Sequence, residues 1–115
     1  IIGQARTIPP TKAEVIALYA LAAQYLGMRY VYIEGGSGVP EPVPPTTIEY
    51  VRGLVNAKII VGGGIKKREQ AEALAKAGAD IIVTGTILEE RDVENKLKNI
   101  VEGVHAGGRS KLKKA

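Results

Sequence analysis

Three short apolar runs, each ending at a loop that contains glycine, divide the chain into units of similar length. The runs occupy residues 30–33, 59–61 and 81–83, and stretches with apolar residues at helical spacing lie between them. The distance along the chain from one run to the next is about that of one strand, one helix and their two loops in a parallel βαβ unit. We therefore predict helix, strand, helix, strand, helix, strand, helix, with parallel strands joined by right-handed crossovers.

Signals at the ends of the helical stretches set their limits. Thr11 and Glu14 form a T-x-x-E capping box, which predicts a helix over residues 12–26 that ends at Gly27. Four apolar side chains of this helix fall on one face at helical spacing: Val15, Leu18, Ala22 and Tyr25.

The remaining elements follow from the same kinds of signal. We predict strands over residues 28–33, 58–61 and 80–83, the first covered on both faces because it is apolar at most positions. A second helix, capped by Thr46 or Thr47, is expected to run to about residue 55. A third is expected over residues 67–77, ending at Gly78, and a fourth over residues 89–104, with residues 107–115 disordered.

Three parallel strands would leave two open sheet edges, which natural proteins avoid. The chain is therefore expected to need more strands, from another part of the protein, another chain or a second copy. A flavodoxin-like sheet is one solution. A glycine loop after every strand favours an eight-stranded β/α barrel, because barrels build their sites from all such loops. The predicted fold class is α/β, with parallel β/α units of a TIM-like (β/α)8 barrel.

Composition and charge narrow the class of protein. The chain has 115 residues, 45 % of them hydrophobic, which fits one globular domain without the ~20-residue apolar run of a membrane span. It has no cysteine, which excludes disulfides and thiolate metal sites and favours a reducing compartment, so we expect a cytoplasmic protein. The net charge of +4 comes entirely from four basic residues near the end: Arg109, Lys111, Lys113 and Lys114.

We accordingly divide the chain into a barrel part, residues 1–106, and a basic flexible tail, residues 107–115. Outside the tail the charges balance, and no basic face with aromatic platforms is visible, so we expect no nucleic-acid partner. The tail is interpreted as a solvated terminus, with weak peripheral contact with anionic lipid as the alternative.

The glycine loops suggest a phosphate cradle, because parallel strands end on one face and bare backbone N–H groups approach anions closely. Residues 62–64 are three glycines without G-x-G-x-x-G spacing. Glu34, at the end of an apolar run, is a candidate general base, metal ligand or partner of a substrate hydroxyl. The alternative for Glu34 is a structural role, in which its carboxylate accepts hydrogen bonds from the backbone amides of the next loop. His105, at the expected end of the last helix, is interpreted as a helix-dipole partner. We see no metal-ligand cluster.

Residues 32–38 (Tyr-Ile-Glu-Gly-Gly-Ser-Gly), 62–65 (Gly-Gly-Gly-Ile) and 77–86 (Ala-Gly-Ala-Asp-Ile-Ile-Val-Thr-Gly-Thr) resemble the archaeal geranylgeranylglyceryl phosphate synthase family. The tyrosine–glutamate–glycine–serine motif is the more specific part of this resemblance. It implies a modified TIM barrel of which this chain is the C-terminal half.

The resemblance implies a prenyltransferase that joins geranylgeranyl diphosphate to the 3-hydroxyl of sn-glycerol 1-phosphate. It makes Glu34 and Tyr32 catalytic, with Tyr32 bordering the cationic allylic carbon. The implied substrate-binding residues are Tyr32, Ile33, Glu34, Gly35, Gly36, Ser37, Gly38, Gly63, Gly64, Gly85 and Thr86. The family's Mg²⁺ ligands come from early strands outside this chain, so the isolated chain is expected to be inactive and to pair with the missing half or form a homo-oligomer.

Three alternatives remain open from the sequence. A bacterial-type member of the same family would use a different prenyl length. Another phosphate-binding barrel, an isomerase or a synthase, would need an acid/base pair across the barrel, of which only Glu34 is visible. A half-barrel fragment without catalytic activity would bind phosphate or self-associate.

Overall fold

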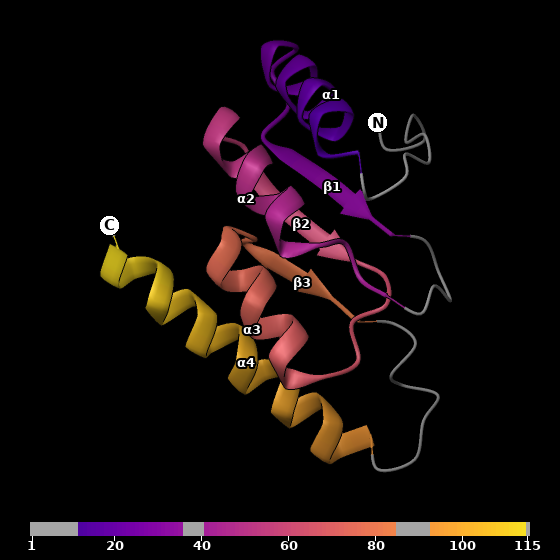
Figure 1. Ribbon diagram of the computed structural model, residues 1–115, viewed down its shortest axis with the longest axis vertical. Coiled ribbons are helices and arrows are strands. Elements are labelled where there is room, and N and C mark those ends of the chain that lie inside the picture. Colours follow the sequence, from indigo (N-terminus) through magenta and orange to yellow (C-terminus); the bar gives the residue numbers. More distant parts are fainter. Residues whose placement is uncertain (1–11, 36–40, 85–92, 115) are drawn as a thin grey trace.

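The computed structural model describes residues 12–35, 41–84 and 93–114. Within these ranges the elements follow the predicted order (Figure 1): α1 (Ala13–Tyr25), β1 (Tyr30–Glu34), α2 (Pro45–Leu54), β2 (Lys58–Gly62), α3 (Arg68–Ala77), β3 (Ile81–Val83) and α4 (Val93–Lys114). The strands form one parallel sheet in the order β1-β2-β3. The predicted sequence of parallel β/α units is therefore confirmed for this part of the chain.

The helices pack against one face of the sheet, and the arrows of the strands point the same way (Figure 1). Ile33, Ile59 and Val61 lie on the covered face and are buried in the core with side chains of α2 and α3. On the other face Tyr30 is 59 % exposed and Ile81 is 43 % exposed. The prediction that the first strand is covered on both faces is wrong for this chain, because three strands cannot curve round to cover their own inner face.

Helix α1 buries a different face from the predicted one. Ile16, Ala17 and Ala20 are buried, whereas Leu18 is 64 % exposed and Tyr25 is 82 % exposed. The helix is apolar on nearly all sides, so spacing alone cannot identify the side that contacts the sheet. A helix of this kind is usually covered all round, which indicates a second partner for its outer face.

The expected threonine cap of α2 is wrong, because the helix begins at least two residues earlier than a cap at Thr46 or Thr47 implies. Its N-cap is Pro44, with no side-chain capping bond, and Pro45 is its first residue. Proline fits this position because its fixed φ suits the helix and its missing N–H would have no intrahelical partner. The expected capping box of α1 includes Thr11, which lies outside the described residues. The two predicted glycine stops, Gly27 and Gly78, are confirmed, and both have positive φ.

The predicted disorder after residue 106 is wrong, because α4 continues to Lys114. Gly103 and Gly107, four residues apart, allow α4 to lie directly against α3: a Cβ atom on Gly103 would stand 2.5 Å from the Arg68 carbonyl oxygen, and one on Gly107 would stand 2.7 Å from Ala75 Cβ. Glycine here serves close packing of two helices rather than disorder.

The longer helix also changes the roles expected for two basic side chains. Lys111 Nζ lies 3.4 Å from the Ala79 carbonyl oxygen and 3.7 Å from Asp80 Oδ1, so part of the basic tail contacts the body of the chain. His105 lies inside α4 rather than at its end, so its interpretation as a helix-dipole partner is wrong.

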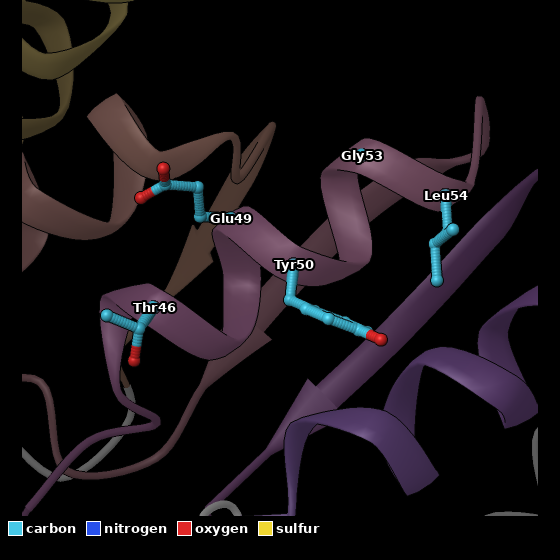
Figure 2. A pocket seen from close by; sticks show the side chains of 5 residues that line it. All are labelled: Thr46, Glu49, Tyr50, Gly53 and Leu54. Atoms are coloured by element: carbon cyan, nitrogen blue, oxygen red, sulfur yellow. The ribbon is translucent and has the colours of Figure 1, made fainter.

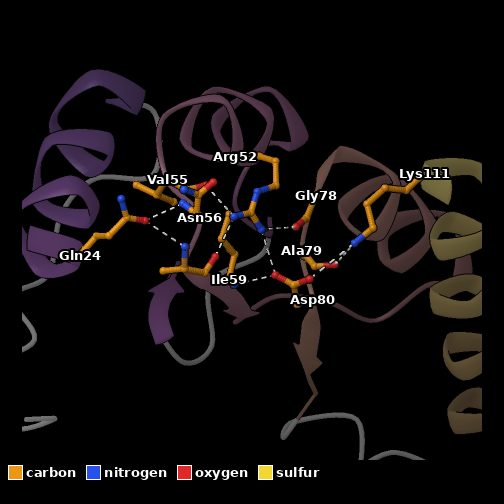
Figure 3. A network of polar contacts seen from close by, with 10 residues as sticks. Gln24, Arg52, Val55, Asn56, Ile59, Gly78, Ala79, Asp80 and Lys111 are labelled. Atoms are coloured by element: carbon orange, nitrogen blue, oxygen red, sulfur yellow. Dashed lines mark hydrogen bonds and ion pairs between the residues drawn. The ribbon is translucent and has the colours of Figure 1, made fainter. Parts of the chain in front are cut away.

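A polar network joins the loops before β2 and β3 at the amino ends of the strands (Figure 3). Arg52 Nη2 donates to the carbonyl oxygens of Val55 and Ala57, both at 2.7 Å, and Nη1 donates to Asp80 Oδ2 at 3.0 Å. Asp80 Oδ2 also accepts a hydrogen bond from the Ile59 N–H at 2.9 Å. This end of a β/α barrel generally serves stability, and ligands bind at the opposite end.

In residues 12–35, 41–84 and 93–114 no helix is long and apolar enough to cross a bilayer.

Candidate functional site

The sheet face turned away from the helices carries two of the predicted site residues. We call it the open face and define it by Tyr30, Tyr32 and Glu34 of β1, Lys58, Ile60 and Gly62 of β2, and Ile81 and Val83 of β3. The register sets Glu34, Gly62 and Val83 side by side at the carboxyl ends of the strands, with Tyr32 one layer below. In a closed barrel this face lines the interior and its carboxyl end carries the site.

Tyr32 and Glu34 lie on the same side of β1 because successive side chains of a strand alternate between faces. The Tyr32 phenol reaches across to β2, where its hydroxyl oxygen stands over the Cα atom of Gly62. Burial of the phenol against the sheet, followed by the Glu34 carboxylate as the smaller cause, raises the pKa of Tyr32 above its usual value of 10.0. Tyr32 therefore keeps its proton, and thus its hydrogen-bond donor, at physiological pH.

The loops after β1 and β2 meet at this end of the sheet. The Gly35 N–H donates to the Gly62 carbonyl oxygen at 3.3 Å. Gly63 and Gly64 have φ of 89° and 74°, a left-handed conformation that glycine adopts without strain. A Cβ atom on Gly64 would stand 2.8 Å from the Glu41 carbonyl oxygen, so the two loops touch through their backbones.

The Gln70 side chain caps the N-terminus of its own helix, α3. Gln70 Oε1 accepts hydrogen bonds from the N–H groups of Lys66, at 2.8 Å, and Lys67, at 3.0 Å. The two lysines precede the helix, which begins at Arg68, one residue later than predicted. Any anion in this loop would therefore be held by the glycine backbone before the helix rather than by these two amides.

The structure brings together five of the predicted binding residues: Tyr32, Glu34, Gly35, Gly63 and Gly64. Ile33 differs, because its side chain is buried in the core on the helix side, so only its backbone can contact a ligand. Gly36, Ser37, Gly38, Gly85 and Thr86 lie outside the described residues. Gly62 was predicted only as part of a loop. It is the last residue of β2, and its contact with Tyr32 depends on strand register, which no single-chain pattern reveals.

No site for a metal ion is recognisable in residues 12–35, 41–84 and 93–114, where no three histidine, aspartate or glutamate side chains gather suitably. The expectation that Mg²⁺ ligands lie in another part of the protein stays a prediction.

Two hollows lie away from these residues. One, of about 520 Å³, is an open depression on α2 in which Tyr50 and Leu54 point toward the side of α1 and Glu49 toward α3 (Figure 2). The other, of about 240 Å³, lies between β3 and α4 and is lined mainly by apolar side chains, together with Thr84 and His105. Neither hollow is lined by a predicted site residue.

Comparison with known proteins identifies relatives of this chain. Residues 1–104 match the PcrB family. The geranylgeranylglyceryl phosphate synthase of Thermococcus kodakarensis is 51 % identical over 106 residues, which are 92 % of this chain and 42 % of that protein.

Two solved structures have a closely similar fold. The (S)-3-O-geranylgeranylglyceryl phosphate synthase of Thermoplasma acidophilum, in complex with sn-glycerol-1-phosphate, superposes with a TM-score of 0.82 at 47 % identity, over 90 % of this chain and 42 % of that one. The enzyme of Thermoplasma volcanium gives a TM-score of 0.79 at 45 % identity, with the same coverage. The chain thus spans less than half of these relatives, and its parallel β/α units are the C-terminal part of a TIM-like barrel. The chain belongs to the PcrB family.

Proposed function

We propose that this chain carries the glycerol phosphate site of a geranylgeranylglyceryl phosphate synthase. The observation that carries the proposal is its 47 % identity to a synthase whose crystal structure contains sn-glycerol-1-phosphate, over 90 % of this chain. The activity would belong to the whole protein, because the chain spans 42 % of that relative.

The reaction would form one bond and break another at the first carbon of the prenyl chain. The 3-hydroxyl oxygen of sn-glycerol 1-phosphate attacks this carbon while its bond to the diphosphate oxygen breaks and diphosphate leaves. Glu34 would accept hydrogen bonds from the glycerol hydroxyls and take the proton of the attacking one. The face of Tyr32 would stabilise positive charge at the allylic carbon. The same side of β1 presents both residues.

The phosphate of the acceptor would lie on bare backbone. Gly63 and Gly64 supply a loop without side chains at the carboxyl end of β2, and Gly35 lies beside it. Ser37, Gly85 and Thr86 complete the proposed cradle. Mg²⁺, where bound, would neutralise the diphosphate, and we assign no step to it.

We also propose that the chain pairs with the rest of the barrel or with a second copy. The half-exposed open face and the outer side of α1 present large apolar side chains, among them Tyr30 at 59 % and Leu18 at 64 % exposure. Parallel sheets are normally covered on both faces and at their edges. We propose in addition that the protein works in the cytoplasm and takes geranylgeranyl diphosphate as its second substrate.

The proposal is tested by incubating the protein at its full natural length with labelled geranylgeranyl diphosphate, Mg²⁺ and either enantiomer of glycerol phosphate. We expect the ether product with sn-glycerol 1-phosphate only, and a decrease of about 100-fold or more in rate for Glu34→Gln. Glu49→Gln, a matched change on the exposed side of α2, should leave the rate unchanged.

Farnesyl and longer prenyl diphosphates assayed in parallel would identify a family member with another chain length. Absence of product with every prenyl donor, together with turnover of a sugar phosphate, would contradict the proposal in favour of a barrel isomerase.

A further inference from the structure

On the open face the phenol of Tyr32 lies closely against Gly62. A Cβ atom built on Gly62 would overlap with the Tyr32 hydroxyl oxygen and would stand 3.3 Å from both Tyr32 Cζ and Val83 Cβ. Even alanine would therefore not fit at position 62 unless the phenol moved. A glycine inside a strand often marks such a close approach.

The backbone of Gly62 gives no other reason for glycine. Gly62 pairs in register with Glu34 on one side and Val83 on the other, as an ordinary member of the parallel ladder. The glycines of positive φ in the described residues are Gly27, Gly63, Gly64 and Gly78, and Gly62 is not among them. The missing side chain is therefore explained by the phenol that lies over it.

We propose that Gly62 is a positioning residue, whose bare Cα seats the Tyr32 phenol across β2 and holds it beside Glu34. This inference rests on the proposed function, because the seat matters to catalysis only if Tyr32 borders the reacting carbon. Gly62 has no side chain with which to contact substrate. It acts by fixing the direction of the phenol.

The contact of the Tyr32 phenol with Gly62, here called the seat, affects the electrostatics of Tyr32 and Glu34. The phenol that lies on the sheet is partly withdrawn from water and close to the Glu34 carboxylate, and both effects raise the pKa of Tyr32. A side chain at position 62 would displace the phenol from the sheet and from Glu34, and the pKa of Tyr32 would fall back toward 10.0.

The test is a double-mutant cycle in the protein at its full natural length. It compares wild type, Gly62→Ala, Tyr32→Phe and the double variant by kcat and by KM for sn-glycerol 1-phosphate. Gly53→Ala is the matched control, because a Cβ atom there meets nothing within 4 Å. Tyr32→Phe removes the oxygen that the new methyl group would strike first. Thermal unfolding and ¹³Cζ-tyrosine NMR across the alkaline range are recorded for each variant.

We expect Gly62→Ala to lower kcat by about tenfold or more and to add at most about a twofold loss in the Tyr32→Phe background, since the two residues would act as one unit. The Tyr32 resonance of Gly62→Ala should titrate at lower pH than in wild type. Effects that multiply independently, or full activity in Gly62→Ala, would overturn the inference.

Failure to fold also gives a result. If Gly62→Ala unfolds and the double variant folds, removal of the hydroxyl has relieved the overlap, which supports the seat. If both unfold, Gly62 is needed for reasons other than Tyr32 and the inference is overturned. A wild-type protein that makes no product would overturn the proposed function instead, while the titration of Tyr32 would still decide whether the seat exists.

Discussion

Removal of the Arg52 side chain should destabilise the protein without touching the candidate site. It lies on α2 and donates hydrogen bonds to the carbonyl oxygens of Val55 and Ala57 and to the Asp80 carboxylate. Arg52→Ala would leave these acceptors without their charged donor. The loops before β2 and β3 would lose their common link (Figure 3).

The size of the effect follows from these contacts. A hydrogen bond to a charged group contributes about 1.5–3 kcal/mol, but the Arg52 side chain is 28 % exposed and its bonds are partly screened. We therefore expect Arg52→Ala to lower the free energy of unfolding by about 3 kcal/mol in total. The matched control is Arg68→Ala, whose partner Glu102 is 3.8 Å away and whose side chain is 46 % exposed. This surface pair should contribute about 0.5 kcal/mol.

The assay is urea unfolding of the protein at its full natural length, followed by circular dichroism. Arg52→Ala should lower the midpoint by about 1 M or more at constant slope, and Arg68→Ala should barely move it. Affinity of the folded variants for glycerol phosphate should not change, because Arg52 lies at the amino ends of the strands. Midpoints for the two variants that agree within experimental error would refute the assigned role of the network.

Two further predictions concern α4 and the site. Gly107→Ala should destabilise the protein by about 1–3 kcal/mol, because the methyl group would meet the α3 backbone. Gly108→Ala should be neutral or stabilising, because a Cβ atom there meets nothing within 4 Å. Thermal unfolding of both variants measures the difference. The folded state binds the Tyr32 proton more tightly than the unfolded chain, so its contribution to stability is complete below pH 10.0 and is lost as pH rises through the higher folded pKa. The Tyr32→Phe variant should therefore lose less stability than wild type as the pH rises from 10.0 to the folded pKa of Tyr32. Urea unfolding at several alkaline pH values measures this loss. Equal losses in the two proteins would contradict a raised pKa of Tyr32 in the folded state.

Much of the fold could be predicted because local signals decide it. The apolar runs and the glycine after α3 gave the order of the elements and the end of that helix. The buried face of α1 could not be predicted, because nearly every side of this helix is apolar. The helical end of α4 could not be predicted, because its glycines and lysines are typical of disorder. Here Gly107 allows close packing on α3, and Lys111 contacts Asp80.

The candidate site was predictable where it depends on a single strand. Tyr32 and Glu34 are two residues apart, so alternation alone puts them on one side. The same rule puts Ile33 on the opposite side, where the structure buries it. The seat on Gly62 was not predictable, because it requires the register between β1 and β2, and register depends on packing of the whole sheet.

We propose above that Glu34 and the glycine loops hold the phosphate acceptor of a prenyltransferase. The most direct test of this proposal is calorimetric titration of sn-glycerol 1-phosphate and its enantiomer into the protein at full natural length. We expect binding of sn-glycerol 1-phosphate in preference to its enantiomer, and we expect this binding to be lost in Glu34→Ala and kept in Glu49→Ala. Equal binding of the two enantiomers, or binding unaffected by Glu34→Ala, would contradict it.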